Sequence, residues 1–318
     1  MYSRIVPDVA TKYELDVLQI GDVQKGYRNE SYPLELANGT EVNLLFYKRE
    51  PGILERIKTA DLVADHAASK GLPVRTRYDN RLLMVGESFA GVYHYLQGTT
   101  ISWESYTKRH IKLLGWAMAD LHVAMEDLSG TGPFQSDELG GLVARMKHYF
   151  SSNDIQQATS SKLDIFVDPA LFDSYSELIE RTRALPGQQY LHMDMVRGNV
   201  LFDNVAANAR WQIDDIRLSG IIDFEKASYG LPIYDIARTL AFLLVDCPKP
   251  RDKIYKYFID SGYRKRGQND VRHIELLPYF IRLFLLHDFY KFLRHTPYES
   301  LHDNYHYSRT RDLLKDYG

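Results

Sequence analysis

The chain of 318 residues has a single cysteine, Cys247, so no disulfide can form within it. A lone thiol suits a reducing compartment such as the cytosol. The first residues also lack the apolar stretch that a signal peptide needs. We therefore expect a soluble, cytoplasmic protein.

Long hydrophobic runs are also lacking. The longest apolar stretches, 236–245 and 279–286, carry Arg238 and Arg282 and are shorter than the roughly 20 residues of a membrane span. The formal charge of −3 gives no reason to expect a nucleic-acid or anionic-membrane partner. With 45% hydrophobic and 25% charged residues, the composition is that of an ordinary globular protein.

Two common signatures of catalysis are missing as well. No segment forms the G-x-x-x-x-G-K phosphate loop, and no H-E-x-x-H or Cys/His cluster completes a zinc site. The sequence has no internal repeat, low-complexity tract or flexible linker. Its length is sufficient for two lobes, each with its own core.

Strand patterns dominate the first hundred residues. The dipeptide Asn38-Gly39 is typical of a tight hairpin turn, and Pro33 in the preceding strand predicts an edge or bulged position. A helix is expected at 54–70, ended by Gly71. The predicted strands are 31–36, 41–47, 81–85 and 91–96.

Helix patterns dominate from Trp103 onward. One apolar face is formed by Ile111, Leu114, Met118, Leu121 and Met125. Further helices are expected at 139–151, at 169–184, after Asp235 and at 271–294. Short strands are expected at 199–203 and 218–222, with a further one possible at 211–213. The sequence therefore predicts an α+β, two-lobe fold with a cleft between the lobes. We place a strand-rich N-lobe at 1–97 and a helical C-lobe at 98–318.

Two motifs in the second half of the chain carry chemistry. Residues His192 to Asn199 fit H-x-D-x-x-x-x-N, and an apolar run ends at Asp223-Phe224-Glu225. Phosphoryl transfer needs a carboxylate that orients the attacking hydroxyl and oxygen ligands that hold Mg²⁺. Asp194 fits the first role, and Asn199 and Asp223 fit the second. Each motif alone is common by chance, but their joint order is not.

These motifs resemble those of the aminoglycoside phosphotransferase and choline kinase superfamily. Residues 192–203 are similar to its catalytic loop, and residues 219–225 with 229–238 to its metal loop and following helix. Weaker likenesses occur at 71–74, 93–98 and 119–122. The resemblance implies a protein-kinase-like fold and transfer of phosphate to small molecules.

The resemblance also implies roles for individual residues. Asp194 would be the catalytic base, and Asn199 and Asp223 would bind Mg²⁺. His192 would brace the catalytic loop, and Asp235 would anchor it. For the nucleotide, the backbone at Tyr93, Tyr95 and Leu96 would bind adenine. Apart from the resemblance, the turn at Gly26 is a candidate to cover the phosphates through its backbone N–H groups, although it is not a G-x-G-x-x-G loop.

One expected residue is missing. The family usually has Lys or Arg in its second N-lobe strand to clamp the α- and β-phosphates, and that position falls on Leu45. Lys48 lies three residues later, on the opposite face of a regular strand. A bulge could re-aim Lys48, Arg28 or Arg49 could substitute, or the clamp could be absent. Its acidic partner would be Glu55 or Asp61.

Two further residues have open roles. Arg197 could contact the γ-phosphate, because a guanidinium matches phosphate oxygens, or it could be a surface residue. Glu225 could lie behind the metal ligands, or it could stabilise a helix N-terminus.

The predicted function is transfer of phosphate from ATP, with Mg²⁺, to a hydroxyl of a small molecule of the aminoglycoside, amino alcohol or sugar type. The alternative is a kinase-fold protein that binds nucleotide or a partner with little or no catalysis. His287 and His295 are expected to be packing or surface residues. Candidate acceptor-binding carboxylates are Glu138, Asp164, Asp173 and Asp288.

Overall fold

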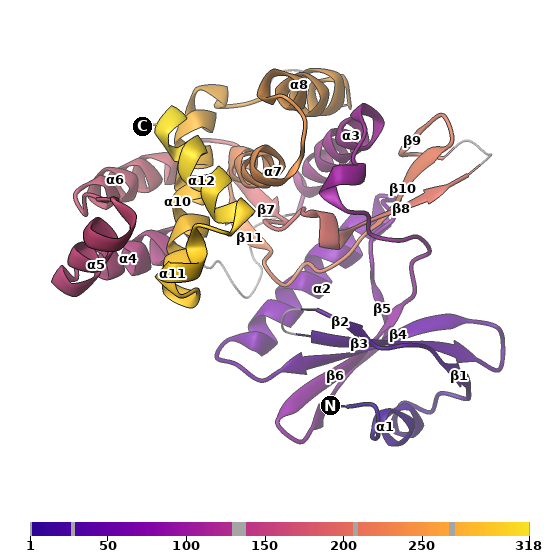
Figure 1. Cartoon of the computed structure of the whole chain (residues 1–318). Coiled ribbons are helices and arrows are strands. Elements are labelled where there is room, and N and C mark those ends of the chain that lie inside the picture. The colour runs from indigo at the N-terminus through magenta and orange to yellow at the C-terminus, as the bar shows by residue number, and fades with distance from the viewer. Residues whose placement is uncertain (1, 27–28, 129–137, 206–208, 267–270, 318) are drawn as a thin grey trace.

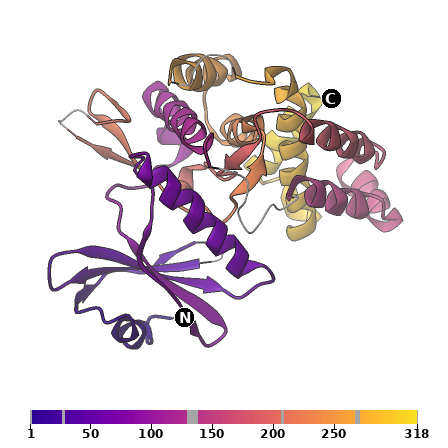
Figure 2. The ribbon, with the colours of Figure 1, turned by 180° about the vertical axis from the view of Figure 1, so that it is seen from behind.

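The computed structural model describes residues 2–26, 29–128, 138–205, 209–266 and 271–317. It has the predicted α+β architecture: an antiparallel sheet lies at one end of the molecule and a helical lobe at the other (Figures 1 and 2). The proposed division of the chain at residue 97 stays a prediction.

The N-lobe is a six-stranded antiparallel sheet in the order β1-β3-β4-β6-β5, with β2 also paired to β3. Helix α1 (Val6–Lys12) packs on one face, where Val6 and Val9 join the apolar side chains of β3 and β4. The strands are β1 (Val17–Ile20), β2 (Gln24–Lys25), β3 (Asn29–Leu36), β4 (Glu41–Lys48), β5 (Arg77–Val85) and β6 (Ser88–His94).

The predicted hairpin between β3 and β4 is confirmed. Gly39 has φ of +80° and its N–H donates to the carbonyl of Leu36 at 2.8 Å. The prediction for Pro33 is wrong, because β3 is an interior strand. Pro33 instead lies where the neighbouring chain is interrupted between β1 and β2, so its missing N–H faces a gap in the pairing.

Helix α2 (Ile53–Ser69) belongs to both lobes. Near its start, Ile53 and Ile57 pack against the sheet. Further along, Val63 and Ala67 are buried in the core of the C-lobe. Gly71, with φ of +76°, follows the helix as expected. Figure 2 shows α2 running obliquely between the sheet and the helical lobe.

The longer predicted helices of the C-lobe are confirmed, and all five residues of the predicted apolar face are buried in α3. Helix α3 begins later than expected, because Thr107 caps it after a short 3-10 turn. The last long helix begins at Leu277 rather than 271, with Pro278 in its first turn. These helices are α3 (Lys108–Met125), α4 (Glu138–Phe150), α6 (Leu171–Arg183), α7 (Pro232–Asp246) and α10 (Leu277–His295).

Other elements have no counterpart in the sequence analysis. They are α5 (Asn153–Leu163), α8 (Arg251–Tyr255), the π-helix η3 (Lys256–Tyr263), α9 (Arg264–Arg266), α11 (Tyr298–Leu301) and α12 (Tyr305–Asp316). Five short strands complete the lobe: β7 (Gln189–Leu191), β8 (Val200–Asn204), β9 (Gln212–Ile213), β10 (Ile216–Ile221) and β11 (Ser228–Gly230). Among the described residues, no helix is long and apolar enough to cross a membrane.

Candidate active site

The two chemical motifs form adjacent loops. Residues 192–199 connect β7 to β8, and residues 222–227 connect β10 to β11. Strands β8 and β10 pair with each other, and β7 pairs with β11, so the ends of both loops are fixed to common sheets. Within this frame the N–H of Ile222 donates to the carbonyl of Asn199 at 2.9 Å.

Asp235, at the start of α7, holds the catalytic loop. Its fully buried carboxylate accepts the backbone N–H groups of His192 at 2.9 Å and Met193 at 2.7 Å, and also contacts Nε2 of His122 at 3.3 Å. Burial raises the pKa of this carboxyl, but the hydrogen bond and charge of His122 outweigh burial and leave the pKa below its ordinary value. Met193 has φ of +60°, a conformation that L-residues rarely adopt, and Asp235 stabilises it.

His192 is fully buried and braces the loop as expected. Its Nδ1 accepts the N–H of Asp194 at 3.1 Å, which leaves Nε2 to donate to the carbonyl of Ile222 at 3.2 Å. Burial lowers the pKa of the imidazole, so the ring stays neutral and keeps this one tautomer. His192 therefore connects the catalytic loop to the metal loop without touching the cleft.

Asp194 is positioned and charged for a role as base. Its carboxylate contacts the ammonium of Lys226 at 2.8 Å and the guanidinium of Arg238 at 3.5 Å. Burial raises the pKa of Asp194, but the charges of Lys226 and Arg238 outweigh it and hold the pKa below its ordinary value. The group is therefore a carboxylate at neutral pH, and only 11% of its side chain is exposed.

Asn199 is joined directly to Asp194. Its Nδ2 donates to the backbone oxygen of Asp194 at 2.9 Å and to the carboxylate at 3.1 Å. Both contacts of the amide nitrogen go to Asp194, and Oδ1, for which no hydrogen-bond partner is found in the described ranges, is left to bind a cation.

Asp223 completes the predicted set. It has φ of +66°, and burial raises the pKa of its carboxyl. The negative charge of Asp194 raises this pKa further. Ile222, next to Asp223 in the chain, hydrogen-bonds to Asn199, so Asp223 and Asn199 belong to one site with Asp194.

The oxygen atoms around Asp223 suit a hard divalent cation. Oε2 of Glu225 is buried and finds no hydrogen-bond partner among the described residues. This oxygen belongs to the metal loop, two residues after Asp223, and Mg²⁺ takes one or two carboxylates and completes its shell with phosphate and water. No group of three or more His, Cys, Asp or Glu able to hold a metal is found in the described ranges.

The two interpretations of Glu225 can now be compared. No helix begins at this residue, since positions 225–226 form a turn and α7 starts at Pro232. The helix N-terminus interpretation is therefore wrong. The other oxygen of Glu225 accepts from Nδ2 of Asn29 at 3.5 Å, which links the metal loop to the start of β3 in the N-lobe.

Arg197 is an exposed residue of the catalytic loop, and in the described ranges no hydrogen bond or ion pair joins it to Asp194. Its charge instead acts on Glu104, whose pKa is lowered mainly by hydrogen bonds. A contact of Arg197 with phosphate stays a prediction.

The structure narrows the options for the phosphate clamp. Leu45 is buried against α2, and the pairing of β4 with β6 is unbroken up to Lys48 and Ser88, so no bulge re-aims Lys48. Lys48 therefore lies on the strand face opposite to Leu45. Arg49 is exposed, and Arg28 lies outside the described residues.

Of the two candidate acids on α2, Asp61 is already paired. Its carboxylate binds Nε of Arg77 on β5 at 2.5 Å and accepts from the hydroxyl of Tyr93 at 3.3 Å. Tyr47 donates to Tyr93 at 2.8 Å. Tyr93 thus turns its side chain toward α2, so only its backbone could face adenine. Glu55, the other candidate, lies in the first turn of α2 and is exposed.

Arg75 is the cation that lies next to the metal loop. Its N–H donates to the carbonyl of Ile221 at 3.0 Å, two residues before Asp223. Its guanidinium lies 5.4 Å from the ring centre of Tyr93. Burial raises the pKa of Asp223, and Arg75 exerts the largest opposing charge effect. No carboxylate partner of Arg75 is found in the described part of the chain.

The connection between the lobes packs tightly on the C-lobe. Gly98 has φ of +119°, and a Cβ there would lie 2.2 Å from Oγ of Ser219. The N–H of Tyr95 donates to the carbonyl of Glu41 at 3.3 Å, whereas no backbone partner of the Leu96 N–H is found among the described residues. Gly26 is exposed at the end of β2, beside residues that lie outside the described ranges.

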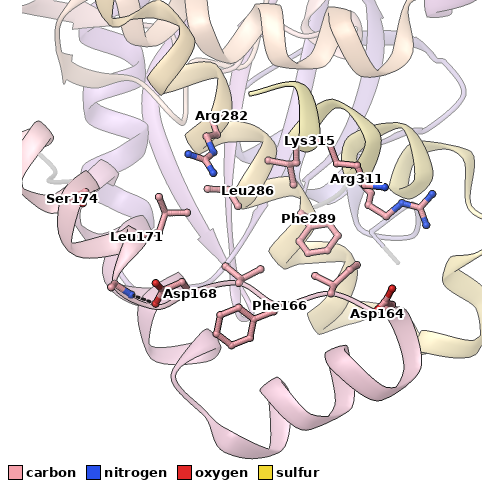
Figure 3. A pocket seen from close by; sticks show the side chains of 14 residues that line it. Asp164, Phe166, Asp168, Leu171, Ser174, Arg282, Leu286, Phe289, Arg311 and Lys315 are labelled. Carbon is pink, nitrogen blue, oxygen red and sulfur yellow. Dashed lines mark hydrogen bonds between the residues drawn. The ribbon is translucent and has the colours of Figure 1, made fainter. Parts of the chain in front are cut away.

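The acceptor candidates lie in different places. Asp288 on α10 binds Lys291 at 2.8 Å, and Asp173 pairs with Lys147 on the surface. Asp164 lines a cavity of about 680 Å³ between the α5–α6 loop, α10 and α12 (Figure 3). The side chain of Glu138 lies outside the described part of the structure.

The cavity in Figure 3 is separate from Asp194. Its lining residues on α10 are Arg282, Leu286 and Phe289. Phe284, whose ring lies 5.5 Å from the guanidinium of Arg238, is on the opposite face of the helix. Helix α10 therefore separates this cavity from the catalytic loop.

Three charged residues of the site are absent from the sequence prediction: Lys226, Arg238 and Arg75. For Arg238 the sequence does contain an indication, because this charged residue interrupts the apolar stretch 236–245. Lys226 is close to Asp223 in sequence but has no motif of its own. Arg75 reaches the site only through the pairing of Val74 with Ile221, far apart in the chain.

Comparison with known proteins shows the family of this chain. A family model described as the phosphotransferase enzyme family, APH, matches residues 20–266. Among curated proteins the search finds no match.

Many solved structures share the fold. Amicoumacin kinase hAmiN, in complex with AMP-PNP, Ca²⁺ and Ami, aligns with a TM-score of 0.68 at 16% identity, covering 99% of this chain and 96% of that one. The GDP and kanamycin complex of APH(2")-IIia aligns with a TM-score of 0.60 at 17% identity, covering 99% of this chain and 98% of that one. Macrolide 2'-phosphotransferase MphH from Brachybacterium faecium aligns with a TM-score of 0.57 at 15% identity, covering 100% of this chain and 98% of that one. With the family model covering most of its length, the chain belongs to the phosphotransferase enzyme family.

Proposed function

We propose that the protein is a small-molecule kinase that transfers the γ-phosphate of ATP to a hydroxyl group. The observation that carries this proposal is the convergence of Asp194, Asn199 and Asp223 on two loops that hydrogen-bond to each other. Neighbours of the same fold were solved with AMP-PNP, GDP or ADP, which supports a nucleotide site in this chain.

The nucleotide would lie between the lobes. The N–H of Leu96, which has no backbone partner among the described residues, is suited to bind adenine, and the turn at Gly26 would cover the phosphates from the N-lobe side. Asn199 and Asp223 would hold Mg²⁺, with Glu225 close by. A bound Mg²⁺ would neutralise charge on the phosphate oxygens.

Arg75 would take the place of the missing clamp. It has no carboxylate partner in the described ranges, and its backbone is fixed beside the strand that leads to Asp223. Asp61, one of the two candidate acids on α2, is paired with Arg77. A guanidinium with free donors next to the metal loop suits phosphate oxygens.

Asp194 would orient the acceptor hydroxyl and accept its proton. Its depressed pKa keeps it ionised at neutral pH, and Asn199 fixes one of its oxygens. Lys226 and Arg238 occupy both carboxylate oxygens in this structure. Lys226, which is half exposed, is the group that an incoming hydroxyl can displace.

The test is phosphate transfer from γ-labelled ATP in the presence of Mg²⁺. We expect Asp194→Asn to reduce turnover by about 10²–10⁴-fold, the range for a positioned acid–base group, while Mg·AMP-PNP still binds. A protein that only binds nucleotide would transfer no label in either form. Unreduced turnover in Asp194→Asn would remove this residue from the reaction.

A further inference from the structure

The catalytic carboxylate is flanked by positive charge on both oxygens. The ammonium of Lys226 lies 2.8 Å from Oδ2 of Asp194, and the guanidinium of Arg238 lies 3.5 Å from Oδ1. Half of the Lys226 side chain is exposed, whereas that of Arg238 is 10% exposed. An acceptor that brings its hydroxyl to Asp194 therefore comes close to two cations.

Helix α10 adds a further cation on this side. The ring of Phe284 lies 5.5 Å from the guanidinium of Arg238, so this face of α10 is turned toward the site. Residues three, four and seven positions later share the same face of a helix. They are His287, Asp288 and Lys291.

The pKa of His287 indicates which sign of charge predominates around this side chain. Burial first, and then the positive charges of Lys291, Arg238, Lys226 and Arg145, together lower the pKa of this imidazole to about 2. The ring is therefore neutral. Arg145 belongs to α4, so positive charge reaches this region from the metal loop, α7, α10 and α4.

The carboxylates of this region are already engaged. Asp194 is shared by Lys226 and Arg238, and Asp288 is bound by Lys291 at 2.8 Å. Asp246 at the end of α7 has its own partner, His306. Asp223 and Glu225 lie on the metal loop, where we place Mg²⁺, so these three carboxylates outside that loop leave none unpaired for an acceptor.

We propose that the acceptor is an anion: a hydroxylated compound that carries a carboxylate or phosphate group, recognised by Lys291 together with Lys226 and Arg238. This inference rests on the proposed kinase function. An acceptor with several ammonium groups would meet like charges here and would find no unpaired carboxylate among the described residues of this face. Repulsion of this kind disfavours the wrong partner strongly.

Matched acceptors that differ only in charge test the proposal. The full-length protein with Mg·ATP is given glycerate, glycerol or 3-amino-1,2-propanediol, and ADP release is measured together with the phosphorylated product. Wider sets of hydroxy acids and sugar phosphates, of neutral sugars, and of amino alcohols and aminoglycosides follow. We expect kcat/KM to be highest for the anionic class, by roughly tenfold or more over matched neutral compounds. Equal or higher kcat/KM for neutral or cationic acceptors would overturn the inference.

Variants of Lys291 test acceptor recognition separately from phosphate transfer, because Lys291 is bound to Asp288 on α10 and not to Asp194. Lys291→Glu should raise KM for the anionic acceptor by roughly tenfold or more and leave the affinity for Mg·AMP-PNP unchanged. Lys291→Gln, which is milder for folding, should give a smaller effect in the same direction. An unchanged charge preference in both variants would contradict the proposal.

Lys315→Glu is the matched control. It makes the same charge change on α12, in the cavity of Figure 3 on the far side of α10, and should alter neither KM nor preference. If Lys315→Glu and Lys291→Glu change KM equally, the effect comes from the net charge of the protein and not from the position of Lys291, and the inference is overturned.

The two proposals fail in different ways. If phosphate goes to cationic acceptors, the anionic acceptor is wrong and the kinase function stands. If no acceptor of any class gains phosphate although Mg·AMP-PNP binds, the kinase function itself is wrong, and the inference falls with it.

Discussion

Single residues define the chemistry of the cleft between the lobes. Asp194 is kept ionised by Lys226 and Arg238, whereas burial raises the pKa of Asp223. Two carboxylates in one site thus have opposite pKa shifts, which is the arrangement expected when one acts as a base and the other awaits a cation.

The role of Asp223 can be tested by binding alone. Asp223→Ala should abolish the Mg²⁺-dependent part of AMP-PNP binding, because it removes the only carboxylate that we assign to the metal. Calorimetric titrations with Mg²⁺ and with EDTA measure this difference. Asp203→Ala, which breaks a partly exposed pair with Arg217, is the control and should bind normally. Identical Mg·AMP-PNP affinity in wild type and Asp223→Ala would refute the assignment.

The proposed role of Arg75 as the phosphate clamp can be tested by measuring nucleotide affinity. Arg75→Met should weaken Mg·AMP-PNP binding by about tenfold or more, since a hydrogen bond to a charged group contributes about 1.5–3 kcal/mol. Lys48→Met should have little effect, because Lys48 lies on the opposite face of β4. Arg81→Met on β5, where Arg81 pairs with Asp79, is the matched control. A larger loss for Lys48→Met than for Arg75→Met would restore Lys48 as the clamp.

Among the structural elements, α7 is the support of the catalytic loop. Asp235 in its first turn accepts two backbone N–H groups of that loop, and Arg238 one turn later reaches Asp194. Helix α3 contributes His122, which is fixed by Tyr263 of the π-helix at 2.8 Å. Three elements distant in sequence therefore determine the conformation of one loop.

Asp235→Asn should lower the free energy of unfolding by about 3 kcal/mol or more, because it breaks a buried charged network. The folded pKa of Asp235 is depressed, so its stabilising effect is full above the unfolded pKa of about 3.9 and is lost as pH falls through the folded value. Urea unfolding of wild type and variant between pH 7 and pH 3 measures this. The stability difference should be largest at neutral pH and shrink in acid. A difference that does not depend on pH would show that charge is not involved.

Local sequence pattern was sufficient for the main elements and for the two loops that carry Asp194, Asn199 and Asp223, because hairpin turns, helix periodicity and the two motifs are encoded by near neighbours; the roles of these three residues stay predictions. It failed where distant segments meet. Pro33 is tolerated inside the sheet only because the adjacent strand is interrupted, and Arg75 reaches the metal loop only because Val74 pairs with Ile221. Neither fact can be inferred from residues close in sequence.

At the scale of the whole molecule, the connection that joins the lobes packs so closely on the C-lobe that Gly98 has no room for a side chain. Gly98→Ala would place a Cβ 2.2 Å from Oγ of Ser219 and 3.0 Å from the carbonyl oxygen of Phe202, at φ of +119°. We expect a loss of about 2 kcal/mol or more in stability, measured by chemical denaturation. Gly86→Ala, at φ of +59° with open space around it, shares the backbone strain and is the control. Equal losses at the two positions would mean that close packing at Gly98 has no effect of its own.

The division of α2 between two cores affects how the molecule can be taken apart. A fragment that ended at the interlobe connection would keep the whole helix but lose the surface that covers its second half. The second half of α2 would then expose a continuous hydrophobic patch to water, formed by Ala60, Val63, Ala64 and Ala67. Such a piece would self-associate on expression, and cutting the chain between sheet and helices would not release an independently soluble half.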